Sequence, residues 1–160
     1  MRKKEIFWLI GTVSFVLIFT IAVFGIDGLK SDAVVDINVY DTYYVIAIIH
    51  LIIPFISLTF FTVYLIRMLG RNFKNLTANL IFMVSDITLI MVITFLISLI
   101  SSIQEIPGST EYPPLSGGSV ENSGDIWNNV YNVLLVIQVF LIILLTISGI
   151  KTGLNYKRVK

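Results

Sequence analysis

Four hydrophobic stretches determine what this chain can fold into. They run over residues 6–26, 42–66, 76–104 and 126–150. Each has about the 20 mostly apolar residues that a membrane-spanning helix needs. The longest stretch outside them, residues 105–125, is much shorter than the roughly 50 residues of the smallest domains. The sequence therefore predicts an all-α integral membrane protein, a single membrane domain over residues 1–160 with four transmembrane helices, and it excludes a separate soluble catalytic domain.

The composition supports the same class. Hydrophobic residues make up 56% of the chain and charged residues 13%, against about 45–50% and about 25% in ordinary soluble domains. The net charge is only +1 and there is no cysteine, so neither a nucleic-acid partner nor a disulfide scaffold is expected. The expected surroundings are a lipid bilayer and other membrane helices.

The basic residues predict the orientation, because Lys and Arg collect on the cytoplasmic side of membranes. When the four spans are folded as a zigzag, ten of the 11 basic residues fall on one side and only Lys30 on the other. The loops on the side of Lys30, residues 27–41 and 105–125, are rich in Asp and Glu. We therefore expect both termini inside, in a multi-pass protein of a bacterial inner membrane.

The connecting segments differ in character. Residues 67–75 form a short basic turn, which predicts that the second and third spans are antiparallel neighbours. Residues 33–41 alternate between apolar and polar side chains, which indicates an extended segment along the outer surface. Residues 105–125 are rich in Pro, Gly and Ser, a composition typical of an irregular external loop.

A few polar side chains lie within the spans, where polar groups need partners inside the bundle. The main ones are His50, Asp86 and Gln138, joined by the hydroxyls of Thr20, Ser85, Thr88, Thr94 and Ser98. Matching depths across the turns places His50, Thr94 and Gln138 in one layer of the outer half. It places Asp86 about 10 Å deeper, at 1.5 Å per residue, so no direct contact between His50 and Asp86 is expected.

These residues have both structural and functional interpretations. Buried His, Gln and Thr side chains commonly join membrane helices by hydrogen bonds, and His50, Thr94 and Gln138 fit that role. An intramembrane carboxylate such as Asp86 is by default a candidate functional site. Burial could keep it protonated, or it could bind H⁺ or Na⁺. The alternative is that Asp86 contacts a partner or only supports the structure, and the sequence leaves both interpretations open.

One segment carries a resemblance to a known family. Residues 41–50 read Asp-Thr-Tyr-Tyr-Val-Ile-Ala-Ile-Ile-His. This sequence resembles the start of the tenth helix of haem–copper oxidase subunit I, roughly D-T-Y-[YF]-V-[VI]-A-H-x-H. It matches at every specified position but one, and it retains Asp41, Thr42, Tyr43, Tyr44 and His50. The resemblance implies that the second span enters the membrane from the outer face, as the charges also predict.

The departures from this pattern bear on the chemistry. In the family, the first His of the motif binds the high-spin haem, and here that position is Ile48. The second His binds the low-spin haem, and His50 occupies its position. The copper site of the family needs about three imidazoles, whereas this chain has one His. Without the family's chemistry, Asp41 and Thr42 could still cap the outer end of the second span, and Tyr43 and Tyr44 suit the membrane interface.

Three functional hypotheses follow. The leading one is a non-catalytic small membrane protein: a truncated, degenerate relative of cytochrome oxidase subunit I, without cofactor or metal. It would act as an accessory or assembly component of a respiratory complex, whose subunits, or a second copy of this chain, would be its partners. The second is a haem-binding electron-transfer subunit that uses His50, with Met91 as the second axial ligand. The third is a small ion or proton carrier that uses Asp86.

Overall fold

The computed structural model describes residues 3–39, 42–104 and 123–157. Its elements are helix α1 (Lys3–Phe24), a short 3-10 helix η1 (Ile26–Leu29), strands β1 (Val34–Val39) and β2 (Thr42–Ala47), and helices α2 (Ile49–Gly70), α3 (Leu76–Gln104) and α4 (Ser123–Lys157). All four α-helices are long and apolar enough to cross a membrane. The four-helix membrane architecture predicted from the sequence is therefore confirmed, while the predicted external loop at 105–125 lies almost entirely outside the described residues.

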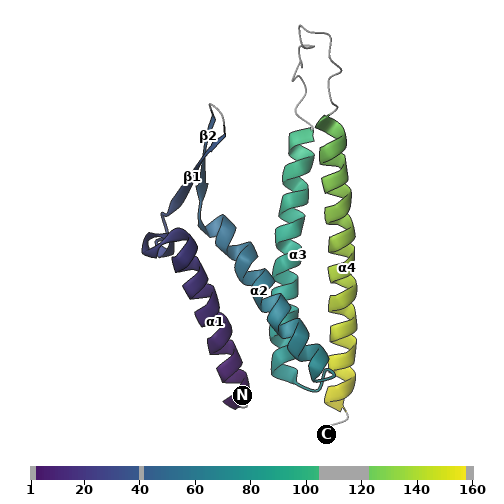
Figure 1. Ribbon diagram of the computed structural model, residues 1–160. Coiled ribbons are helices and arrows are strands. Elements are labelled where there is room, and N and C mark those ends of the chain that lie inside the picture. The colour runs from purple at the N-terminus through teal and green to yellow at the C-terminus, as the bar shows by residue number, and fades with distance from the viewer. Residues whose placement is uncertain (1–2, 40–41, 105–122, 158–160) are drawn as a thin grey trace.

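Helices α3 and α4 lie side by side along their length, and α2 crosses them at a tilt (Figure 1). Near the turn between α2 and α3, a buried cluster joins Tyr64, Met68, Phe73, Ala78 and Phe82. A second buried cluster, farther along α3, contains Leu89, Ile93 and Leu141. The ring centroids of Phe61 and Phe82 lie 5.2 Å apart, and the chain reverses at the turn between the two helices (Figure 1). Helices α2 and α3 are therefore antiparallel neighbours, as the short basic turn predicts.

Helix α1 packs against α2 rather than joining the α3–α4 pair. The rings of Phe19 and Phe55 stack with centroids 4.2 Å apart. Gly25, with φ of 71°, follows α1 directly, a backbone conformation that glycine adopts without the steric cost of a side chain. The chain then turns through η1 into the hairpin, which lies beyond the outer ends of α1 and α2 (Figure 1).

The hairpin corrects one predicted boundary. The second span was predicted as a helix over 42–66, but residues 42–47 form strand β2, and α2 begins only at Ile49. Strand β2 pairs antiparallel with β1, with Val34 opposite Ala47 and Val39 opposite Thr42. The aromatic and β-branched residues of 42–46 favour a strand, and the extended segment predicted for 33–41 supplies the partner. Hydropathy alone does not mark this break, because the apolar run continues through it.

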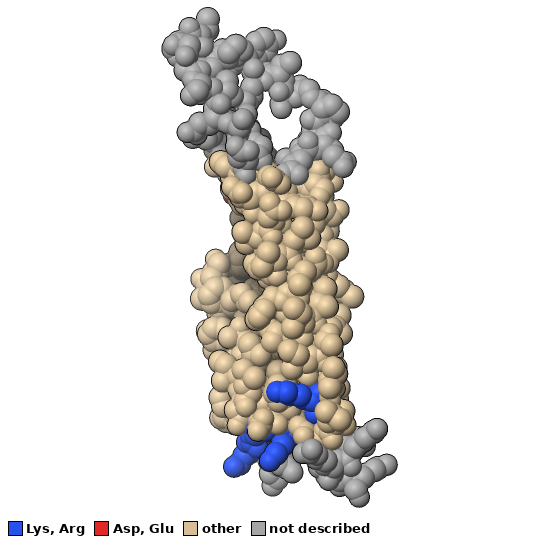
Figure 2. All heavy atoms as spheres, turned by 90° about the vertical axis from the view of Figure 1, so that its right-hand side faces the viewer, with Lys and Arg blue, Asp and Glu red and all other residues tan. Residues whose placement is uncertain are grey.

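Apart from Lys30, the described basic side chains gather at one end of the molecule. Figure 2 shows the Lys and Arg residues of one face at the end where both termini lie, below a wall of uncharged side chains. We call this the inner end, following the orientation expected from the charges.

Candidate functional site

Asp86 lies in the middle of α3 and is completely buried. Neither of its carboxylate oxygens has a hydrogen-bond partner among the described residues. Among the described residues the ion pairs are Arg67–Glu5 and Lys30–Asp27, and neither supplies Asp86 with a counter-ion. An unpaired carboxylate charge is very costly to bury, and Asp86 is therefore the strongest candidate for a functional group in the protein.

Other polar residues lie along the contact between α3 and α4, which we call the α3–α4 seam. Asn79 is seven residues earlier, on the same helix face, and its Nδ2 donates to Thr152 Oγ1 of α4 at 2.9 Å. At the outer end of the seam, Gln138 Nε2 donates to Thr94 Oγ1 at 2.8 Å. The shared layer predicted for Thr94 and Gln138 is therefore confirmed.

Ser148 completes the polar side of this seam. It is completely buried and lies four residues before Thr152 on the same face of α4. Its hydroxyl donates to the carbonyl of Leu145 at 2.9 Å, which leaves the hydroxyl oxygen able to accept. The two inter-helix hydrogen bonds set the register and place Ser148 between the levels of Asn79 and Asp86. Sequence reasoning passed over Ser148, although its spacing from Thr152 was the available signal.

The inner end of the seam is covered by the turn between α2 and α3. Asn72 and Phe73 have φ of 48° and 61°, a conformation that is uncommon for residues other than glycine and an outlier for a bulky one. Asn79 Nδ2 donates to the carbonyl of Phe73 at 2.9 Å, and Asn155 Nδ2 donates to it at 3.2 Å. The Nζ of Lys151 lies 4.6 Å from the Phe73 ring centroid. Side chains of α3 and α4 thus hold this turn in place.

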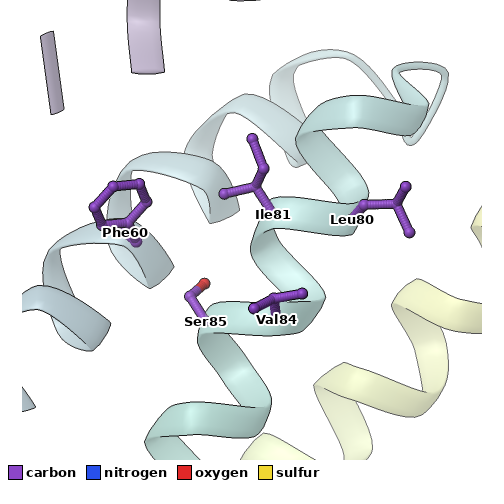
Figure 3. Close-up of a pocket in the computed structure, with 5 residues that line it drawn as sticks. All are labelled: Phe60, Leu80, Ile81, Val84 and Ser85. Carbon is purple, nitrogen blue, oxygen red and sulfur yellow. The ribbon is translucent and has the colours of Figure 1, made fainter. Parts of the chain in front are cut away.

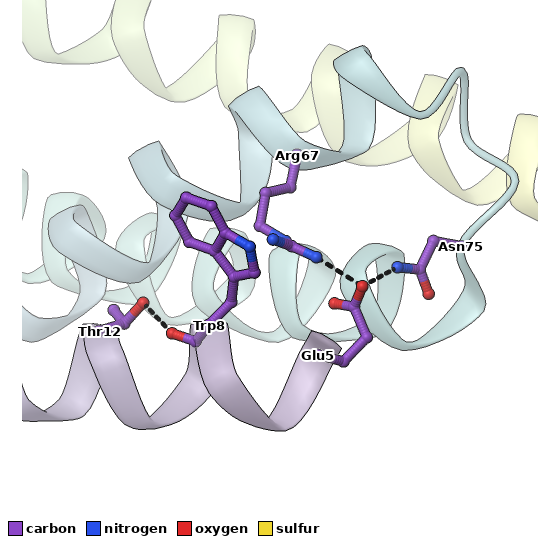
Figure 4. Close-up of polar contacts among 5 residues, drawn as sticks. All are labelled: Glu5, Trp8, Thr12, Arg67 and Asn75. Atoms are coloured by element: carbon purple, nitrogen blue, oxygen red, sulfur yellow. Dashed lines mark hydrogen bonds and ion pairs between the residues drawn. The ribbon is translucent and has the colours of Figure 1, made fainter. Parts of the chain in front are cut away.

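A second polar cluster ties the start of α1 to the bundle (Figure 4). Arg67 Nη2 and Asn75 Nδ2 both donate to Glu5 Oε1, at 2.5 and 2.6 Å. The guanidinium carbon of Arg67 lies 4.6 Å from the Trp8 ring centroid. Glu5 and Arg67 are both nearly buried, yet Glu5 Oε2 and Arg67 Nε have no partner in the described structure. The sequence analysis counted Arg67 only as a topological charge and did not single out Glu5.

Tyr64 is the remaining buried polar side chain without a partner. It lies on α2, is completely buried, and stacks on Phe60 with ring centroids 6.0 Å apart. Its hydroxyl has no hydrogen-bond partner within the described ranges. The Phe61–Phe82 pairing places Tyr64 at about the level of Asn79.

The candidate haem ligands are both exposed. His50 lies in the first turn of α2, and Met91 on α3 is 65% exposed. His50 makes no side-chain hydrogen bond in the described part of the structure, so no hydrogen bond links it to the Gln138–Thr94 pair. Among the described residues, no three His, Cys, Asp or Glu side chains come together as a group that could hold a metal ion.

The segment that resembles the oxidase motif lies mainly on strand β2 rather than at the start of a helix. Tyr43 is 73% exposed on the hairpin. The predicted capping of the second span by Asp41 and Thr42 is wrong, because Ile48 precedes α2 and no side chain caps it. Asp41 and the side chains of Thr42 and Tyr44 lie outside the described structure. Ile48 is buried, and its N–H donates to the carbonyl of Ala33 at 2.9 Å, so it anchors the hairpin.

Comparison with models of protein families, with curated proteins and with solved structures found no match to this chain.

Proposed function

We propose that this chain is a non-catalytic membrane protein, a truncated and degenerate relative of haem–copper oxidase subunit I. In this proposal it serves as an accessory or assembly component of a respiratory complex. The observation that carries the proposal is the segment 41–50, which keeps the pattern of the family but has Ile48 where the family has a haem ligand. An aliphatic side chain offers no atom to a metal.

The surroundings of Ile48 support a structural use of this position. Its side chain is buried beside Gly28 of η1, and its backbone N–H bonds to the carbonyl of Ala33. The position that holds a haem ligand in the family is therefore occupied here by a side chain that packs the hairpin onto the outer end of α1. Tyr43 and Val45, 73% and 66% exposed on strand β2, then present an apolar surface that suits contact with another membrane subunit.

Site-specific cross-linking from the hairpin tests this proposal. A photoreactive residue at Tyr43 or Val45, in the membrane where the protein is made, should cross-link to subunits of a terminal oxidase. The same residue at Leu154, 60% exposed near the opposite end of the molecule, is the matched control. Deleting the gene should lower the amount of assembled oxidase. Unchanged oxidase in the deletion strain, with no cross-link to its subunits, would contradict the proposal.

The proposal also predicts the optical spectrum of the purified protein. A non-catalytic relative should show no reduced-minus-oxidised difference in the Soret region. A stoichiometric Soret band that disappears in His50→Ala would instead support the haem-binding hypothesis, in which an imidazole supplies an axial ligand.

A second function, proton or small-cation exchange at Asp86, is favoured by the burial of both unpartnered oxygens of this carboxylate. A protonated carboxyl group is neutral and fits an apolar bundle, whereas the ionised form needs a cation or water. Liposomes that contain the purified protein and a pH-sensitive dye should show a proton flux driven by a potassium diffusion potential. Asp86→Asn should abolish this flux, and Ser85→Ala, one residue away, should not. Equal flux in the wild type and Asp86→Asn would contradict this function.

A further inference from the structure

The buried polar atoms without partners are confined to one half of the molecule. Among the described residues they are Glu5 Oε2, Tyr64 Oη, Arg67 Nε, Asn79 Oδ1 and both carboxylate oxygens of Asp86. All of them lie between the level of Asp86 and the inner end. Buried polar groups in native proteins are almost always hydrogen-bonded, to protein or to water. This distribution suggests that water reaches the inner half of the bundle.

Two of these groups, Asn79 and Asp86, lie on one face of α3 along the α3–α4 seam. Asn79 lies about 10 Å from Asp86 along α3, at 1.5 Å per residue, and points its Nδ2 at Thr152. Ser148 lies between the two levels on the facing side of α4. The side chains of Asp86, Ser148 and Asn79 can each accept or relay a hydrogen bond. The distances between their levels are short enough for a few bridging waters.

The outer side of Asp86 has the opposite character. Leu89, Ile93 and Leu141 form a buried apolar cluster between the level of Asp86 and the outer hydrogen bond of Gln138 to Thr94. Such a layer offers no partner to water. A proton on Asp86 can therefore exchange with water on the inner side more readily than on the outer side.

We propose that Asp86, in the conformation described, exchanges its proton with the inner face, along a hydrated path on the α3–α4 seam through Ser148 and the Asn79–Thr152 pair. The proposal deepens the second function above, on which it rests, by naming the proton as the exchanged ion and the inner face as its source. Water takes the proton from the carboxyl group as hydronium, leaving a carboxylate, and the reverse transfer restores the neutral acid.

The charged and titratable groups near this path lie towards its inner end. Tyr64 faces the bundle from α2, Glu5 of α1 is paired with Arg67 of α2, and Lys151 of α4 lies against Phe73. Phe73 is buried under the inner mouth of the seam in a left-handed conformation. Such strained residues persist only where neighbours fix them, and they cluster at switch regions. The Phe73 turn therefore covers the inner end of the path, and exchange with the inner face requires this turn to move.

Deuterium exchange at the carboxyl group of Asp86 tests the path. The protonated carboxyl band, identified by its loss in Asp86→Asn, is followed by infrared spectroscopy after transfer of the reconstituted protein to D₂O. Asn79→Leu and Gln138→Leu are a matched pair, because each replaces an amide that joins α3 to α4, one at each end of the same seam. Asn79→Leu should slow the exchange about tenfold, as for a site that exchanges only on opening, and Gln138→Leu should leave it unchanged.

Two results would overturn the proposal. One is that Gln138→Leu slows the exchange while Asn79→Leu leaves its rate unchanged. The other is the absence of a protonated carboxyl band in the wild type. Neither result depends on net flux. A protein that passes this test but transports no protons would retain the inner path as a binding route and lose only the transport function.

Cysteine labelling gives a second test that does not change Asn79. The chain has no cysteine, and Ser148 and Ser85 form a matched pair. Both are buried and both donate to the carbonyl three residues earlier. Ser85, however, lies at an apolar pocket of about 340 Å³ lined by Phe60, Leu80, Ile81 and Val84 (Figure 3). A charged, membrane-impermeant thiol reagent should label Ser148→Cys from the inner side only and Ser85→Cys from neither side. Labelling of Ser148→Cys from the outer side would contradict the path.

Discussion

At the scale of single residues, Glu5 and Arg67 show how the bundle uses charge at its inner end. The side chain of Arg67 is 9% exposed and that of Glu5 is 3% exposed, so each charge depends on the other. Such a pair need not stabilise the fold more than an apolar pair would, but removing one partner leaves the other charge buried alone. This asymmetry gives a quantitative prediction.

We expect Arg67→Met to lower the free energy of unfolding by about 3 kcal/mol, because it leaves the Glu5 carboxylate without its cation. The double variant Glu5→Leu with Arg67→Met should recover most of that loss. Titration with a denaturing detergent, followed by circular dichroism, measures both values. Arg71→Met is the control, because Arg71 follows the end of α2, is exposed, and its loss should have little effect. A double variant as unstable as Arg67→Met would argue against the ion pair.

Residues of the site differ in how well the sequence predicts them. The hydrogen bond between Gln138 and Thr94 follows from matching depths across the turns, because depth in an antiparallel bundle is nearly fixed by sequence position. The burial of Glu5 does not follow from depth. It depends on how α1 is rotated about its axis, and an acidic residue among N-terminal lysines looks like a solvated charge.

At the scale of elements, the hairpin is the part that hydropathy could not separate from a helix. An apolar run at the membrane boundary serves either structure, and the decision depends on whether residues 34–39 are available as a partner strand. The start of α2 at Ile49 therefore depends on a tertiary contact, whereas α1, α3 and α4 follow directly from length and hydropathy.

The corner between α1 and the hairpin is tightly packed at Gly28. A Cβ atom placed there would lie 2.5 Å from Cβ of Phe24 and 3.8 Å from Cδ1 of Ile48. We expect Gly28→Ala to lower the free energy of unfolding by about 1–3 kcal/mol, as overpacking does. Gly149→Ala on α4 is the control, because a Cβ there meets no atom within 4 Å, and it should be neutral or stabilising by up to about 1 kcal/mol. The same detergent titration measures both, and equal losses would argue against tight packing at this corner.

At the scale of the whole molecule, polarity divides the bundle into two halves. The inner half combines the basic ends of the helices with the Glu5–Arg67 pair and the polar groups that lead to Asp86. The part of the seam just beyond Asp86 is closed by apolar side chains. Each proposed function depends on which half faces the cytoplasm, because the hairpin must reach its partner on the outer side and Asp86 must take its proton from the inner side.

This orientation is itself open to measurement. The distribution of Lys and Arg predicts both termini inside. Green fluorescent protein fused after Lys160 should therefore fluoresce in a bacterial host, and alkaline phosphatase at the same position should be inactive. Fusions after Ser102, at the outer end of α3, should give the reverse pattern. Lys30→Gln should change neither result, because it removes only the single basic residue expected outside. Fluorescence from the Ser102 fusion would show the opposite orientation in the membrane. The end of the bundle that supplies protons to Asp86 would then face the outside of the cell.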